Sequence, residues 1–153
     1  MRDFALAALL PLFALLSSCK RETVATVVVS VYDVPDAGRL SDADRNELLN
    51  LTQAPRSGSG AHLMMISRFP VGKGLTLMCD QGLPDGSNEL DTRFRCWVEP
   101  MGGGQCRVLP EFEVKTADGK SLSLDKGEAA LSAGGRVLVV LNPRTVAAFG
   151  LKP

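Results

Sequence analysis

The sequence has few of the side chains that most often carry catalysis and ligand recognition. Its 153 residues contain one histidine, one tryptophan and one tyrosine, and aromatic residues make up 5% of the chain. A hydrolase with a Ser-His-Asp or Cys-His arrangement would have to use His62, and no Gly-x-Ser-x-Gly motif accompanies it. The scarcity of aromatic residues also disfavours a surface that stacks against sugars.

An excess of either charge is absent too. Lysine plus arginine and aspartate plus glutamate number 17 each. Nucleic-acid binding needs a basic face, so we expect no nucleic-acid partner. A group of acidic residues lacks the Asp-x-Asp-x-Asp-Gly pattern of a calcium loop, and we interpret it as a solvated turn and helix start. The group consists of Asp33, Asp36, Asp42, Asp44 and Glu47.

The chain also lacks an apolar run that could serve as a permanent membrane span near its start. Residues 4–16 are apolar except for Pro11, whereas a spanning helix needs about 20 apolar residues. The run follows Met1-Arg2-Asp3 and precedes Ser17-Ser18, which is the charged, apolar, small-residue order of a secretory signal peptide. We therefore predict that residues 1–18 are an export signal.

The end of this segment, Leu16-Ser17-Ser18-Cys19, resembles the lipobox of bacterial lipoproteins. The resemblance implies cleavage before Cys19, a diacylglycerol on its thiol and an acyl chain on its amino group. Two chains give stable anchoring, because each buried methylene contributes about 0.8 kcal/mol. Lys20 stands where that family's inner-membrane retention signal has aspartate, which implies the outer membrane, facing the periplasm. An ordinary signal peptide with a coincidental cysteine is the alternative.

Three cysteines then remain for the mature chain, namely Cys79, Cys96 and Cys106. In an oxidising periplasm we expect one disulfide and one leftover thiol, which would act as a small buried hydrophobe. Alternation of polarity places all three toward the core. We favour a Cys96–Cys106 disulfide because a turn-rich segment at 99–105 separates the two strands, and Cys79–Cys96 is the alternative.

The mature chain reads as one domain, with residues 19–22 as a lipidated tether and residues 23–153 as the folded part. Short β-branched and alternating segments separated by Gly/Pro turns predict a mainly β domain, a single sandwich or small barrel. Asp118-Gly119 predicts a hairpin turn. We also predict two short helices, one inserted at about 42–51 after a Ser41 cap, and one at about 143–149 after Asn142-Pro143. The predicted strands are 23–32, 62–69, 74–79, 94–98, 106–109, 111–116, 120–124 and 136–141.

Three functions compete for this domain. The first is a non-catalytic lipoprotein that docks an envelope protein. Residues 24–51, with Val27-Val28-Val29-Ser30-Val31-Tyr32 followed by a loop and a Leu-bearing helix, are loosely similar to the lipoprotein subunit of type VI secretion systems. That similarity implies a transthyretin-like sandwich that anchors a membrane complex.

The second function is a periplasmic module that binds a small ligand or copper. The soft ligands that suit Cu(I) are His62, Met64, Met65, Met78, Met101 and the odd thiol. We expect Met64 and Met65 on opposite faces of one strand, and zinc binding by three cysteines and His62 lacks the usual close spacing. The third function is a hydrolase built on His62. We favour the first, with no metal, no cofactor and no catalytic residues.

Overall fold

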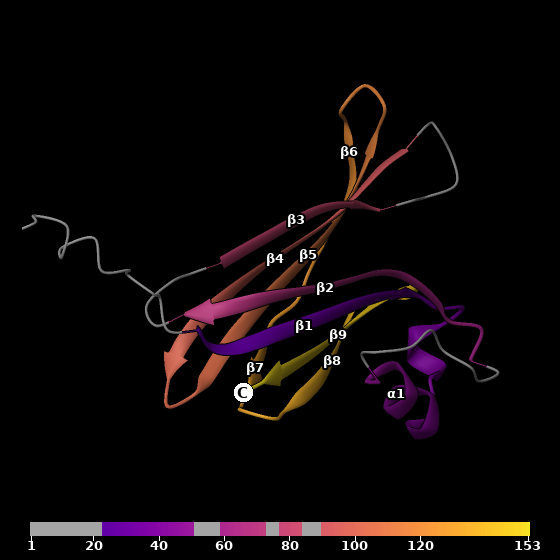
Figure 1. The fold of residues 1–153 in the computed structure, drawn as a ribbon. Coiled ribbons are helices and arrows are strands. Elements are labelled where there is room, and N and C mark those ends of the chain that lie inside the picture. The colour runs from indigo at the N-terminus through magenta and orange to yellow at the C-terminus, as the bar shows by residue number, and fades with distance from the viewer. Residues whose placement is uncertain (1–22, 51–58, 73–76, 84–89) are drawn as a thin grey trace, which may run out of the picture.

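The computed structural model describes residues 23–50, 59–72, 77–83 and 90–153. Within them, two antiparallel β-sheets pack face to face, and one α-helix lies against the outer side of one sheet (Figure 1). The sheets of the described part do not join into a closed barrel. The predicted fold class, a mainly β sandwich-like domain with one inserted helix, is confirmed.

Sheet A has the strand order β2-β1-β9-β8, and sheet B has the order β3-β4-β5-β6, with β7 also pairing with β5. The elements are β1 (Thr23–Asp33), the 3₁₀ helix η2 (Ala37–Arg39), α1 (Asp42–Leu48), β2 (His62–Gly72), β3 (Leu77–Leu83), β4 (Leu90–Gly102), β5 (Gln105–Thr116), β6 (Ser121–Lys126), β7 (Ala129–Leu131), β8 (Arg136–Asn142) and β9 (Thr145–Lys152). The segments predicted at 106–109 and 111–116 form the single strand β5, which continues through Pro110.

The topology is a meander in which each paired strand is antiparallel to its neighbours. The chain passes from sheet A to sheet B between β2 and β3, and returns between β7 and β8. Pairing of β1 with β9 joins the first strand to the last. The two sheets are therefore two parts of one up-and-down meander. In the described residues, β2 is not paired with β3 and β7 is not paired with β8.

Strand β1 is buried on both faces, which explains its almost continuous β-branched sequence. Val27, Val29 and Val31 face sheet B and join the main core. Val28 and Tyr32 point the other way, into a second core beneath α1. All five are at most 1% exposed.

Helix α1 begins where the sequence predicts. The Ser41 hydroxyl accepts a hydrogen bond from the Asp44 backbone N–H at 3.1 Å, and the Asp44 carboxylate accepts one from the Ser41 N–H at 3.1 Å. This reciprocal pair is a capping box. The helix ends at Leu48, whose fully buried side chain packs in the second core. The predicted end at about residue 51 is therefore too late, because Leu49 is the C-cap and Asn50 is no longer helical.

The predicted C-terminal helix at 143–149 is wrong, because Thr145–Lys152 forms strand β9. The cap signal is real, since the Asn142 side-chain oxygen accepts a hydrogen bond from the Arg144 N–H at 2.9 Å, but it closes the β8–β9 turn instead of starting a helix. Residues 145–151 are all buried, so the strand shows no alternation that would identify it. Hydrogen-bonded neighbours on both edges, β1 and β8, override the local signal.

The predicted hairpin turn at Asp118-Gly119 is confirmed. It joins β5 to β6, with hydrogen bonds from the Gly119 N–H to the Thr116 carbonyl at 2.8 Å and from the Thr116 N–H to the Lys120 carbonyl at 2.9 Å. Gly119 has a φ of 87°, which favours glycine at this position. The hairpin projects past the end of sheet A (Figure 1).

Candidate functional site

A cleft of about 470 Å³ opens between the two sheets at the end of the sandwich where β1 finishes and β2 starts. Its described lining residues come from β1, β2, β4, β5 and β9 together with the β8–β9 turn, and they are Asp33, His62, Leu63, Met64, Thr92, Phe112, Arg144 and Thr145. The Arg144 guanidinium donates to both carboxylate oxygens of Asp33, at 3.2 and 2.9 Å. Thr92 and Thr145 are 7% and 4% exposed, so the cleft combines buried hydroxyl-bearing residues with an ion pair at its rim.

His62, the single histidine, lies exposed at the first position of β2 and lines this cleft. The described lining contains no serine or cysteine that could act as a nucleophile beside it. The acidic residue of the described lining, Asp33, forms an ion pair with Arg144. The described residues therefore do not bring His62 into a Ser-His-Asp or Cys-His arrangement.

The methionines that the sequence singled out are dispersed. Met64 and Met65 were expected on opposite faces, but Met65 lies in the main core and Met64 packs against that core and lines the cleft. A register shift in the β1–β2 pairing, where the partners of Val31 and Tyr32 are Met65 and Leu63, inserts Met64 as an extra residue. Met101 lies on β4 and is 55% exposed, whereas the side chain of Met78 lies outside the described residues. Groups of three or more His, Cys, Asp or Glu with metal-site geometry do not occur among the described residues.

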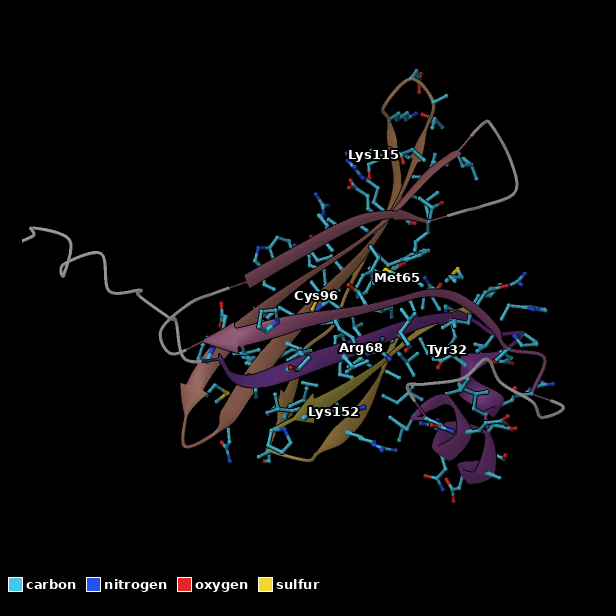
Figure 2. All side chains as sticks on the ribbon, in the orientation of Figure 1. Tyr32, Met65, Arg68, Cys96, Lys115 and Lys152 are labelled. Carbon is cyan, nitrogen blue, oxygen red and sulfur yellow. The ribbon has the colours of Figure 1, made fainter. Side chains whose placement is uncertain are left out.

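The favoured Cys96–Cys106 disulfide is wrong. Cys96 pairs with Pro110 and Cys106 with Pro100, so the β4–β5 register separates the two cysteines by four residues, or about 13 Å along the strands. Both are buried, at 0% and 1% exposure, as predicted, and Figure 2 shows Cys96 and Met65 between the sheets. Burial raises the pKa of the Cys106 thiol.

Cys79 takes the register position directly opposite Cys96 in the β3–β4 pair. Opposite positions in an antiparallel pair have Cα atoms about 4.5 or 5.5 Å apart, inside the range that a disulfide bridges. The alternative pairing, Cys79–Cys96, therefore stays a prediction that the backbone register allows. The side chain of Cys79 lies outside the described residues.

The outer face of sheet B carries a ladder of ion pairs. Glu113, 7% exposed, accepts from Arg95 at 2.7 Å and faces Lys115 at 3.4 Å, while Glu111 accepts from Lys126 at 2.8 Å. Arg107 pairs with Glu99 and, at 3.5 Å, with Glu128. An open hollow of about 560 Å³ beside the ladder is lined by Trp97, Leu109, Pro110, Glu111, Lys126, Gly127 and Glu128. Arg95, Arg107, Lys115 and Lys126 on this face each lie within 4 Å of a carboxylate.

Exposed apolar side chains lie at the start of β4 and along β6, with Leu90 and Leu124 on different faces of sheet B. Leu90 is 39% exposed, Leu122 55% and Leu124 44%. Leu124 lies opposite Glu113 in the β5–β6 register and so belongs to the outer face of sheet B. Leu90 lies opposite Thr116, next to the turn of the same hairpin. This end of sheet B therefore offers apolar contact area outside the core.

The predicted lipidation site, Cys19, lies outside the described residues, as do the signal peptide and the tether. The described chain begins at Thr23 in β1, at the end of the sandwich opposite α1 and the β5–β6 hairpin (Figure 1). Among the described residues, no helix is long and apolar enough to cross a bilayer.

Sequence reasoning singled out His62, Met64 and Asp33 but missed the other residues of the cleft. Thr92, Phe112 and Arg144 come from distant segments, and no local pattern marks them as members of one site. Only the Asn142-Pro143 turn signal could have indicated that Arg144 lies at the end of a hairpin. The acidic residues near α1 have structural roles, since Asp36 caps η2 and Asp44 completes the capping box.

Comparison with known proteins gives no family assignment. The chain matches no family model, no curated protein and no solved structure.

Proposed function

We propose that this protein is a membrane-anchored lipoprotein of the cell envelope that docks another envelope protein and catalyses no reaction. The observation that supports the proposal is that the start of β1, the described element nearest in sequence to Cys19, and the exposed leucines of the β5–β6 hairpin lie at opposite ends of one sandwich. The lipobox cysteine precedes β1 by four residues, and the exposed leucines of the β5–β6 hairpin lie at the far end (Figure 1).

The tether is short. Four residues from Cys19 to Thr23 span at most about 14 Å when fully extended. Lipid on Cys19 would therefore hold the start of β1 close to the outer membrane, in the periplasm. The hairpin and the cleft would then face away from that membrane, where a periplasmic or membrane-spanning partner could reach them.

The hairpin is the contact surface that we propose. Leu122 and Leu124 are about half exposed, and apolar side chains of this size contribute most when a partner covers them fully. The resemblance of residues 24–51 to the type VI secretion lipoprotein suggests a secretion or envelope-assembly complex as the setting.

Crosslinking in intact cells tests this surface. A photo-reactive residue at position 122 should capture a specific protein, and Leu124→Ser should abolish the crosslink while the protein remains in the membrane fraction. Val140→Ser is the matched control, because Val140 is similarly exposed, at 45%, but lies on sheet A. Capture that persists in Leu124→Ser, or that is lost equally in the control, would contradict docking through the hairpin.

Ligand binding in the cleft is the second candidate. The observation in its favour is that His62 and Met64, one imidazole and one thioether, line the same cleft. Copper at one per chain in protein purified from the periplasm, lost in both His62→Ala and Met64→Leu, would favour this function over docking. Full retention of the cellular phenotype in His62→Ala would exclude both a copper site here and a hydrolase.

A further inference from the structure

The outer face of sheet A presents a row of cations near the start of β1. Arg68 on β2 lies opposite Val28, Val28 lies opposite Gly150 on β9, and Gly150 lies opposite Arg136 on β8. Arg68 and Arg136 therefore occupy the two ends of one row across all four strands. Lys152 lies two residues further along β9, opposite Thr26, and shares this face.

These three side chains are exposed, and Figure 2 labels Arg68 and Lys152 beside β1 and β9. No carboxylate of the described residues forms a salt bridge with any of them. Among the described residues, Arg136 donates to the Leu49 carbonyl at the end of α1, at 3.4 Å. We call Arg68, Arg136 and Lys152 the basic row.

The cations of the basic row differ from those on sheet B in their ion pairing. On the outer face of sheet B, Arg95, Lys115 and Lys126 all lie within 4 Å of a glutamate. The chain has equal numbers of acidic and basic residues, so the unmatched cations of sheet A result from their distribution and not from an overall excess. Helix α1, which lies on the same face, carries Asp42, Asp44 and Glu47, so the positive charge is confined to the basic row itself. A row of cations without acidic partners among the described residues favours an anionic partner.

The distance from the tether suggests which anion. Lys152 lies opposite Thr26, three residues after Thr23. Arg68 lies opposite Val28, five residues after Thr23. At about 3.4 Å per residue these cations lie roughly 10 and 17 Å along the sheet from the start of β1. Tilting only the tethered end of this face toward the membrane would bring the row to the headgroups, within about a Debye length, while α1 at the other end of the face stays farther out.

We infer that the basic row binds the anionic phospholipid surface of the membrane to which the chain is anchored, and so sets the tilt of the domain. This inference rests on the proposed lipid anchor for its geometry. One acylated tether restrains only one point of the domain, whereas a charged face fixes its orientation. The leucines of the β5–β6 hairpin would then be held at a constant angle to the membrane.

The experiment measures partition of the full chain with Cys19→Ser into phosphatidylcholine vesicles with and without phosphatidylglycerol. The ratio of the two partition coefficients cancels the contribution of the apolar amino-terminal segment, which is common to both vesicles. Each cation near an anionic surface contributes about 1 kcal/mol, and 1.4 kcal/mol is tenfold. Arg68→Gln, Arg136→Gln and Lys152→Gln together should lower the ratio about a hundredfold, and Lys152→Gln alone about fivefold.

The matched control removes three exposed cations elsewhere, by Arg39→Gln, Lys120→Gln and Lys126→Gln, and so has the same net charge. Its ratio should stay within about twofold of the parent chain, and salt near 0.5 M should abolish the preference of the parent for anionic vesicles. Equal losses in both triple variants, or no loss in the basic-row variant, would overturn the inference. Because no acyl chain is needed, this result is independent of whether Cys19 is lipidated in cells.

Discussion

Gly127 lies in the short connection between β6 and β7, and its replacement with alanine should destabilise the sandwich. A Cβ at this position would lie 2.5 Å from Val139 Cγ1 and 3.3 Å from Leu141 Cδ2, and contacts shorter than 3.0 Å do not occur between real Cβ atoms and their neighbours. Val139 and Leu141 are each 8% exposed in the core. The Gly127 N–H also donates to the Pro110 carbonyl at 2.9 Å, which fixes the backbone.

The clash cannot be relieved by a simple rotation, because a β-branched valine has few allowed χ1 angles in a strand. Strand β8 or the β6–β7 segment must shift instead, and overpacking of this kind costs about 1–3 kcal/mol. The free energy of unfolding, measured by urea denaturation of the mature protein, should fall by that amount with an unchanged m-value.

Gly82→Ala is the control, since its Cβ would meet nothing within 4 Å and its φ is ordinary. It measures, in the same chain, the stabilisation of up to about 1 kcal/mol that alanine gives by restricting the unfolded state. Adding Val139→Ala to Gly127→Ala should recover stability relative to the sum of the single changes, because the clashing methyl group is gone. Equal unfolding free energies for Gly127→Ala and Gly82→Ala would refute the close packing of Gly127 against Val139 and Leu141.

Two further predictions concern the cysteines and the β5–β6 turn. Non-reducing peptide mapping of the mature protein should show a Cys79–Cys96 disulfide and a Cys106 thiol that an alkylating reagent modifies only after unfolding; three reactive thiols in the native protein would contradict this. A hydrogen bond from Thr116 lowers the pKa of the exposed Asp118 carboxyl below its ordinary value. Its stabilisation is therefore complete above the ordinary pKa of an aspartate and lost as the pH falls through the lowered pKa. Asp118→Asn should reduce stability at neutral pH but not in strong acid, as acid-unfolding curves would show.

The sequence predicted correctly those parts of the fold where the local propensity of the residues agrees with the structure that tertiary packing requires. The β-branched run of β1, the capping box at Ser41 and the Asp118-Gly119 turn are all found where the sequence indicates them. At β9 the two preferences conflict, because Asn142-Pro143 resembles a helix start while the central position in sheet A demands a strand. Only the pairing with β1 and β8 decides between them.

The register of β4 against β5 could not be read from the sequence. A segment as rich in glycine as 99–105 permits several turns, and each one gives Cys96 a different partner. The strands continue to Gly102 and Gln105, which pair with each other, and this tight turn moves Cys106 away from Cys96. Likewise, the cleft around His62 unites β1, β2, β4, β5 and the β8–β9 turn, so its composition depends on the whole topology.

The most direct test of the proposed function is the intact mass of the mature chain isolated from membranes. We expect a chain that starts at Cys19 and carries a thioether-linked diacylglycerol and an amide-linked acyl chain, and we expect Cys19→Ser to remove both and release the protein from the membrane fraction. A mature chain with an unmodified amino terminus, or a chain still carrying residues 1–18 in the cytosol, would contradict the anchor on which the docking function depends.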